Sequence, residues 1–193
     1  MRLNYRKGLI LAILPAFLFT QCQQPASKEE SSSETATEDP VARGEYLVNA
    51  MGCDDCHTPK TMTPEGPAPD MSRRFMGHPA EEPFPPAFDT TLITKNNVAV
   101  FSPGLTAAAG PWGVSFAGNL TPDETGIGTW SEEQFFRAIR EGKFKGLANG
   151  RPMLPPMPWQ SYRNLNDEDL SAVFAYLKSM PPIKNVVPAP KSL

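Results

Sequence analysis

Apolar residues recur with helical spacing in three segments of the chain, one early and two in the C-terminal third. The first segment predicts a helix over about 41–51, with Tyr46, Leu47 and Ala50 on its apolar stripe. Gly52 follows, and glycine commonly ends a helix. This first helix therefore stops directly before the part of the sequence that carries the strongest chemical signal.

The two later segments combine an apolar face with signals for helix ends. Ser131 and Gln134 form a capping-box pattern, which opens a helix that ends near Gly142. Asn166 is placed to cap a last helix over 167–180, and acidic residues crowd its first turn, where the helix dipole favours them. The apolar faces of these two helices consist of Phe135, Phe136 and Ile139, and of Leu170, Val173, Phe174 and Leu177.

Residues 58–118 differ from these segments, because they are crowded with proline and glycine and show no sustained period. This composition predicts an extended loop insertion, with a short hairpin around 91–100. A long irregular stretch inside a compact domain usually carries function or wraps around something.

The first 40 residues form a separate region. An apolar run from Leu9 to Phe19 follows three basic residues and is too short to span a bilayer comfortably, which predicts an export signal over 1–21. The residues before Cys22 resemble a bacterial lipoprotein cleavage site, although Gln21 replaces the usual small residue. Cys22 is therefore the predicted lipidation site, with an uncleaved anchor or an ordinary cleaved signal as the alternatives.

Residues 22–40 are rich in Gln, Ser, Thr and Glu and contain almost no apolar side chains. Such a segment cannot bury enough surface to offset chain entropy, so we expect a disordered acidic tether behind the lipid anchor. The remaining residues, 41–193, are enough for one domain with its own core. The formal net charge of the whole chain is −3, and nothing in it indicates nucleic-acid binding.

The sequence Cys53-Asp54-Asp55-Cys56-His57 is the attachment signature of a c-type haem. The two thiols add to the vinyl groups of the porphyrin, and His57 then lies under the iron as its proximal axial ligand. We therefore predict one covalent haem c, bound by Cys53, Cys56 and His57, with residues 58–118 wrapped around it. The porphyrin supplies apolar surface that this segment lacks.

Two other kinds of site use the same cysteine spacing. A thioredoxin-like redox pair expects a βαβ context, which the pattern of this chain lacks. A structural zinc site needs two further ligands, and only Cys22 and His78 remain. Haem attachment is therefore the favoured interpretation.

The second axial ligand decides between a closed electron carrier and a haem open to small ligands. Met157 is the predicted distal ligand, because flanking prolines stiffen its backbone and its loop, which precedes the last helix, can cross the open haem face. Met153, His78 and the absence of a protein ligand are the alternatives. In its Gly-His-Pro context, His78 is more typical of a turn or surface residue than of a ligand.

Three weaker predictions concern the surroundings of the haem. The indole N–H of Trp130 can reach a haem propionate, or the ring can simply pack in the core. One of Pro67 or Pro69 is expected to offer a carbonyl to the free nitrogen of His57 and so fix its orientation. Arg137 can pair with a propionate, although an arginine on a helix is more often solvated.

Over most of residues 41–185 the chain resembles the class I cytochrome c domains. The resemblance rests on the motif at 53–57, on Asn-Leu-Thr-Pro-Asp-Glu-Thr-Gly-Ile-Gly-Thr-Trp-Ser at 119–131, and on the segment from Met-Pro-Trp-Gln-Ser-Tyr to Asp-Glu-Asp-Leu at 157–170. The last two segments are similar to the cytochrome subunits of membrane-bound bacterial alcohol and aldehyde dehydrogenases. Those subunits carry three haem domains, whereas this chain has one haem motif.

The resemblance implies an all-α, cytochrome c-like domain of three to five short helices wrapped around one haem, with long Pro/Gly-rich loops. It also implies that the first and last helices pack together, and Tyr46 and Leu47 are the expected contacts of Phe174 and Leu177. Met157 occupies the Met-Pro-aromatic position of the distal ligand. Because thioether bonds of c-type cytochromes form outside the cytoplasm, we expect a periplasmic or cell-envelope location.

The expected function is electron transfer between redox proteins, namely a dehydrogenase or respiratory complex and an acceptor such as a terminal oxidase. The chain is not expected to be an enzyme, because its sequence offers no convincing nucleophile or acid–base pair. The alternative is a haem enzyme or a gas or redox sensor with an exchangeable distal ligand, in which His78 or Asp89 acts on the bound molecule. A purely structural Cys/His metal site is the third hypothesis.

Overall fold

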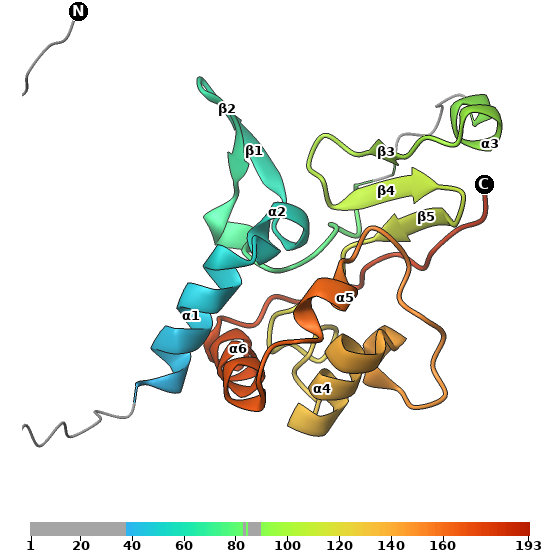
Figure 1. The fold of residues 1–193 in the computed structure, drawn as a ribbon. Coiled ribbons are helices and arrows are strands. Elements are labelled where there is room, and N and C mark those ends of the chain that lie inside the picture. Colours follow the sequence, from blue (N-terminus) through green and yellow to red (C-terminus); the bar gives the residue numbers. More distant parts are fainter. Residues whose placement is uncertain (1–37, 83, 85–89) are drawn as a thin grey trace, which may run out of the picture. The chain divides into compact units, whose positions relative to one another are not determined.

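The computed structural model describes residues 38–82, 84 and 90–193 (Figure 1). The predicted export signal, the predicted lipidation site Cys22, nearly all of the predicted tether, and Asp89 lie outside these residues. The described part of the chain belongs to one unit, residues 37–193. Within it, no helix has both the length and the apolar character needed to cross a membrane.

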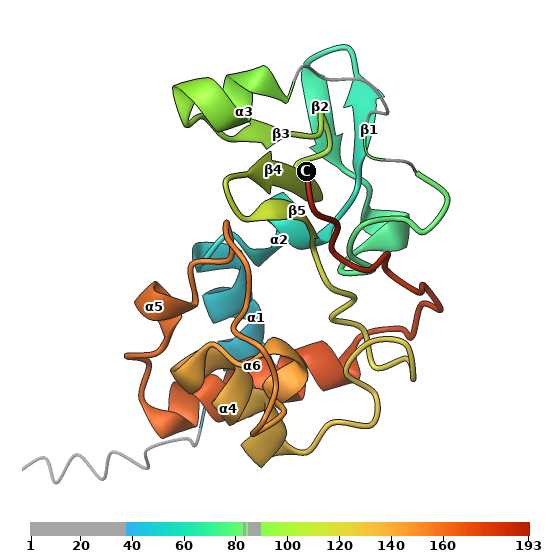
Figure 2. The same ribbon diagram turned by 90° about the vertical axis from the view of Figure 1, so that its right-hand side faces the viewer.

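This unit contains helices and short strands, which come in groups along the chain. The helices are α1 (Pro40–Ala50), α2 (Cys53–His57), α3 (Thr91–Asn96), α4 (Glu132–Glu141), α5 (Trp159–Tyr162) and α6 (Asp167–Ser179), with single 3-10 turns η1 (Met71–Arg73) and η2 (Phe144–Gly146). The strands are β1 (Lys60–Thr63), β2 (Gly66–Pro69), β3 (Val100–Phe101), β4 (Ala107–Gly110) and β5 (Gly113–Phe116). Helices α4 and α6 lie at the opposite end of the unit from the strands in both views (Figures 1 and 2).

Helix α1 packs against α6 through a face that contains a glycine. The buried residues of α1 are Gly44, Leu47 and Val48, and a Cβ atom at Gly44 would overlap the backbone carbonyl of Ala172 in α6. The packing of the first and last helices is therefore confirmed. The predicted stripe is wrong in part, because Tyr46 is 63% exposed and Ala50 is exposed as well. The close approach at Gly44 turns the buried face of α1 away from Tyr46.

The signals for the ends of α4 and α6 are confirmed by their hydrogen bonds. The hydroxyl of Ser131 accepts a hydrogen bond from the backbone N–H of Gln134 at 3.1 Å, and α4 ends at Gly142 in the left-handed conformation. The side chain of Asn166 accepts from the N–H of Asp169 at 2.6 Å. The main core cluster consists of Leu47, Val48, Phe75, Ile127, Phe135, Ile139, Leu170, Ala172, Val173, Tyr176 and Leu177.

The strands correct the prediction of an all-α domain, because helices are only part of this fold. Strands β1 and β2 form an antiparallel hairpin, and β3, β4 and β5 form an antiparallel sheet in that order. The predicted hairpin around 91–100 is wrong, because residues Thr91–Asn96 form helix α3. Of the predicted hairpin, only the last residue, Val100, belongs to a strand, β3. All four residues of β4 are buried, so this strand has no alternation of apolar and polar residues by which it could be recognised.

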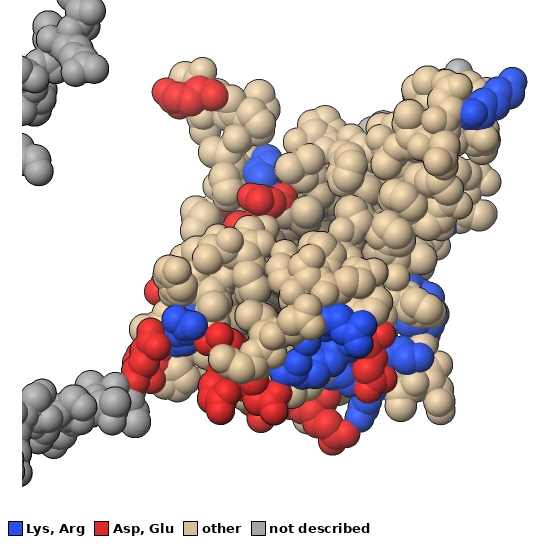
Figure 3. Space-filling model, in the orientation of Figure 1, with Lys and Arg blue, Asp and Glu red and all other residues tan. Residues whose placement is uncertain are grey.

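Charge is distributed unevenly over the same unit. Residues 96–122, which include β3, β4 and β5, contain no charged residue. On the face shown in Figure 3, most charged side chains gather around the end that carries α4 and α6. Electrostatic interactions of this face with other molecules are therefore concentrated at its helical end.

Candidate haem-binding site

Helix α2 brings the three residues of the predicted haem motif together. It is a single turn that begins directly after Gly52, whose φ of 68° lies in the left-handed region favoured by glycine. Cys53 and Cys56 lie three positions apart and so share one face of the turn, and His57 is its last residue. All three side chains are half-buried.

The imidazole of His57 is held by a backbone carbonyl. Its Nδ1 lies 2.7 Å from the carbonyl oxygen of Gly118. A carbonyl only accepts hydrogen bonds, so Nδ1 carries the proton and the lone pair of Nε2 is available to a metal. Burial lowers the pKa of His57, which favours the neutral imidazole that ligates iron.

The acceptor for His57 differs from the predicted one. Pro67 and Pro69 lie in strand β2, and neither offers its carbonyl to the ring. Gly118 follows strand β5 and lies 61 residues from His57 in the sequence. Its contribution is a backbone oxygen, which no side-chain pattern in the sequence reveals.

Both thiols lie in surroundings that disfavour the thiolate. Burial, followed by the negative charge of Asp54, raises the pKa of Cys53 to about 12. Burial also raises the pKa of Cys56. A thioredoxin-like redox pair needs a lowered thiol pKa, so this chemistry is disfavoured. Within the described residues no group of three His, Cys, Asp or Glu side chains could hold a metal ion, which gives no support to a structural metal site.

The end of α2 is closed by a lysine that the sequence prediction missed. The ammonium group of Lys60 donates hydrogen bonds to the carbonyls of Asp54 and Asp55, each at 3.0 Å, and of Thr58 at 2.6 Å. A cation at this position satisfies the last carbonyls of a helix and opposes the negative end of its dipole. A lysine three residues after the haem motif was the available signal.

Met157 lies in the loop that precedes α5. The loop is attached to the sheet by the hydroxyl of Ser115, which donates to the carbonyl of Pro155 at 2.6 Å. The half-buried side chain of Met157 packs against the main core cluster, as does that of Cys53. Met153 is also half-buried, but it does not pack against this cluster.

His78 lies at a bend of the chain, as predicted, but it is buried and not on the surface. Its side chain is only 2% exposed, and both ring nitrogens have partners. Nε2 donates to the carbonyl of Glu82 at 2.7 Å, and Nδ1 lies 2.9 Å from the hydroxyl of Thr106. With both nitrogens engaged, His78 offers no lone pair to an iron.

Two further aromatic residues, Trp130 and Tyr162, pack against the main core cluster. The ring of Trp130 is half-buried, and its indole N–H has no hydrogen-bond acceptor among the described residues. The hydroxyl of Tyr162 donates to the carbonyl of Met51 at 2.9 Å. Burial, then the proximity of Cys53 and Cys56, raises the pKa of Tyr162, which places this ring close to the motif. Tyr162 was missed because an isolated tyrosine is common in any core.

Arg137, which was considered for a propionate, is engaged within the protein. Its guanidinium donates to the carbonyl of Gly146 at 3.0 Å and to the carboxylate of Glu133. Both contacts lie on α4 and η2, so the structure gives this arginine a local role at the end of a helix.

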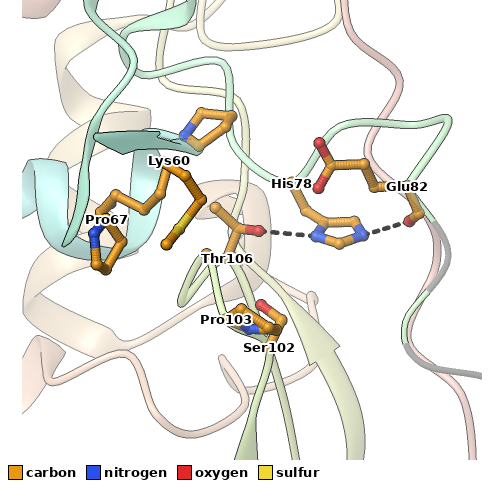
Figure 4. Close-up of a pocket in the computed structure, with 10 residues that line it drawn as sticks. Lys60, Pro67, His78, Glu82, Ser102, Pro103 and Thr106 are labelled. Carbon is orange, nitrogen blue, oxygen red and sulfur yellow. Dashed lines mark hydrogen bonds between the residues drawn. The ribbon is translucent and has the colours of Figure 1, made fainter. Parts of the chain in front are cut away.

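A separate cavity of about 250 Å³ lies between the β1–β2 hairpin and the turn before β4 (Figure 4). Lys60, Pro67, Ser102 and Pro103 are among the residues that line it, and the paired ring of His78 closes one side. None of the cysteines of the motif, His57 or Met157 lines this cavity, so it is not part of the predicted haem site.

Comparisons with known proteins show what this chain is similar to. Residues 41–181 match the family model for cytochrome c. The gluconate 2-dehydrogenase cytochrome c subunit of Pantoea cypripedii is 33% identical over 137 residues, which are 70% of this chain and 22% of that protein. The fructose dehydrogenase cytochrome subunit of Gluconobacter japonicus is 28% identical over 169 residues, which are 86% of this chain and 26% of that protein.

A shorter match has a higher identity. One of the subunits of the nicotinate dehydrogenase of Pseudomonas putida is 46% identical over 80 residues, which are 41% of this chain and 6% of that protein. The chain thus spans from 6% to 26% of the length of these three relatives. The similarity concerns a domain of each relative and not the whole protein.

Proposed function

The chain belongs to the cytochrome c family, and on this premise we propose that it is an exported electron carrier in which His57 and Met157 ligate the iron of one covalent haem c. The observation that carries the proposal is the hydrogen bond from His57 Nδ1 to Gly118, because it leaves Nε2 free beside the two attachment cysteines. The half-buried thiols and the neutral imidazole fit haem c, which supplies the reversible one-electron iron couple when bound.

In this proposal, the protein residues around the motif bind the haem, orient its axial ligands and shield it from water. Cys53 and Cys56 provide the covalent attachment, and Gly118 keeps the ring of His57 in one tautomer and one orientation. Met157 supplies a thioether sulfur from a loop that Ser115 anchors to strand β5. Two permanent ligands limit the rearrangement that accompanies a change of charge, which suits electron transfer better than substrate chemistry.

Trp130 contributes a hydrogen-bond donor in this proposal. Its indole N–H has no acceptor within the described part of the chain, and the ring packs against the same core cluster as Cys53 and Met157. A haem propionate is an acceptor of matching chemistry for this group.

The partners are redox proteins, and the location is the periplasmic side of a membrane. The relatives are named as subunits of gluconate and fructose dehydrogenases, so we propose that a dehydrogenase or another respiratory complex donates the electron. The export signal over 1–21 and the lipid anchor at Cys22 belong to the proposal on sequence grounds alone. A Cys22→Ser variant should leave the membrane fraction while it retains its haem.

Replacement of the two loop methionines tests the ligation directly. Ferric holoprotein should show the absorption band that arises from charge transfer between methionine sulfur and iron. Met157→Ala should abolish this band, whereas Met153→Ala, a change in the same loop, should leave it intact. Survival of the band in Met157→Ala would refute the distal assignment. Ready binding of carbon monoxide by the wild-type protein would favour the sensor hypothesis instead.

A further inference from the structure

The two residues between the attachment cysteines have different surroundings. Asp55 is exposed, whereas the side chain of Asp54 is 18% exposed and forms an ion pair with Arg74. Arg74 precedes Phe75 in the segment after η1 and is itself only 11% exposed. A buried ion pair inside a cofactor-attachment turn incurs a desolvation cost, so its geometry calls for an explanation.

The guanidinium of Arg74 connects three helices. Nε and Nη2 donate to the carboxylate oxygens of Asp54 in α2, at 3.0 and 2.6 Å. Nη1 donates to the hydroxyl of Tyr176 in α6 at 2.7 Å, and Nη2 also donates to the side-chain oxygen of Asn49 in α1 at 2.7 Å. All three guanidinium nitrogens are engaged, and the turn that carries the haem motif is thereby fixed to the α1–α6 pair.

The same network reaches Thr58, the residue that follows His57. The hydroxyl of the fully buried Thr58 donates to Asp54 at 2.7 Å and accepts from the N–H of Phe75 at 3.0 Å. The N–H of Gly77 donates to the carbonyl of His57 at 2.8 Å. Phe75 has a φ of 62°, a conformation that a bulky residue keeps only where its surroundings determine it fully.

We propose that Arg74 is a positioning residue for the proximal ligand. Through Asp54 and Thr58 it fixes the backbone of the attachment turn, while Gly118 fixes the ring of His57. These two constraints together set the angle between the imidazole and the haem and therefore influence the reduction potential. The inference rests on the proposed ligation by His57.

The role requires an arginine and not only a positive charge. A planar fork can bind both oxygens of a carboxylate and still reach two further acceptors, whereas an ammonium group on a flexible stem cannot reproduce this geometry. Arg74→Lys therefore keeps the charge but removes the geometry. Arg74→Gln removes both.

The chain provides a matched control for these variants. Arg43 in α1 donates to Asp169 in α6 at 2.8 Å, so it also joins the two terminal helices by an ion pair, but its described polar contacts do not include α2. Variants Arg43→Lys and Arg43→Gln should reduce stability without an effect on the haem. The four variants are compared with wild type as holoproteins.

Three measurements on each holoprotein separate the roles. They are the electron paramagnetic resonance g values of the ferric form, the midpoint potential, and the urea midpoint of unfolding. Positioning by Arg74 predicts that Arg74→Lys and Arg74→Gln both shift the g values and the midpoint potential. The two Arg43 variants should shift only the urea midpoint.

Other outcomes overturn the proposal. Wild-type g values in Arg74→Lys, with a lower potential only in Arg74→Gln, would show that the charge acts alone. If the Arg74 variants changed the urea midpoint but kept wild-type g values and midpoint potential, Arg74 would have a structural role only. Should the Arg74 variants not fold, the isosteric Asp54→Asn provides the same test, and unchanged g values there would refute the proposal. If the spectra of the wild-type holoprotein showed no histidine ligation of the iron, the proposed function itself would be refuted. If they showed histidine ligation but the Arg74 variants kept wild-type g values and midpoint potential, only the role of Arg74 would be refuted.

Discussion

The turn that carries His57 and the loop that carries Met157 are secured by different means. The turn is held by side-chain hydrogen bonds from Arg74, Thr58 and Lys60, most of them shielded from solvent. The loop is held to strand β5 by a side-chain hydrogen bond from Ser115, and to the end of α4 by a backbone hydrogen bond from the N–H of Met153 to the carbonyl of Gly142 at 2.7 Å. Its prolines stiffen the backbone between these attachments. More side-chain hydrogen bonds therefore fix the proximal turn than fix the distal loop.

This difference matches the chemistry proposed for each side. A covalently attached cofactor needs a proximal ligand that never leaves, and a dense polar network resists local opening. A distal thioether has only to remain close to the iron, so a stiff loop is sufficient. Substitutions on the two sides should consequently differ in the size and in the kind of their effects.

The largest effect is expected at Gly77, next to the proximal turn. Its φ is 78°, and a Cβ atom there would lie 2.5 Å from the carbonyl oxygen of Ala117. Gly77→Ala combines backbone strain with a clash against backbone and should cost about 3 kcal/mol or more. Urea unfolding of the holoprotein, followed by circular dichroism, measures this cost.

The β1–β2 turn supplies the control for Gly77→Ala. Gly66 has a φ of 116°, but its Cβ would meet no atom within 4 Å. Gly66→Ala should therefore show the strain alone, about 1–2 kcal/mol. Equal costs for the two variants would contradict the close packing inferred around Gly77.

A smaller effect is expected at Thr58. Thr58→Val keeps the shape of this fully buried side chain but removes the hydroxyl that joins Asp54 to Phe75, which should cost about 1–3 kcal/mol. The exposed Thr61 in β1 is the matched control, and Thr61→Val should stay within about 0.5 kcal/mol of wild type. Urea unfolding distinguishes the two, and a neutral Thr58→Val would show that the network adds no stability.

The distal loop should respond more weakly in stability. Ser115→Ala removes the hydrogen bond to Pro155 and should cost about 1 kcal/mol. Because this bond anchors the loop of Met157, carbon monoxide should also bind faster to the ferrous variant than to wild type. Ser161→Ala, at an exposed position in α5, should change neither quantity. An unchanged binding rate in Ser115→Ala would show that the hydrogen bond from Ser115 is not needed to keep Met157 at the iron.

The smallest expected effect is a pH dependence of stability, which arises from Asp54 on the proximal side. Burial opposes ionisation of Asp54, but hydrogen bonds from Arg74 and Thr58 prevail and lower its pKa. A lowered folded-state pKa adds stability above the unfolded value of about 4 and loses it as pH falls through the folded value. Wild type should therefore lose more stability than Asp54→Asn between pH 6 and pH 3 in urea unfolding. Equal losses of stability in the two proteins would contradict the lowered pKa of Asp54.

The sequence predicted the helices that have end signals of their own. Ser131 and Asn166 cap their helices as expected, because capping depends on residues only three positions apart. The stripe of α1 was less predictable, since Tyr46 satisfies the helical period but the buried face is set by the contact of Gly44 with α6. Local signals thus define where a helix lies, and tertiary packing defines which face it buries.

The candidate site also contains residues that local sequence predicts and contacts that only the tertiary structure reveals. The cysteines and the histidine of the motif are recognisable because haem attachment requires them at fixed spacing. The acceptor of His57 was not predictable, because it is the carbonyl of Gly118, and neither was the partner of Asp54, because Arg74 lies 20 residues away. Strand β4 was missed because its small buried residues show no alternation.

The 61-residue separation between His57 and Gly118 has an evolutionary consequence. The free energy of closing a loop grows only with the logarithm of its length, so doubling the intervening segment would cost only about 0.6 kcal/mol. Insertions into the exposed connections of this segment are therefore cheap, provided that Arg74, Gly77 and both ends stay in place. Homologous domains can diversify this segment, with new surfaces and new partners, while the imidazole keeps its orientation.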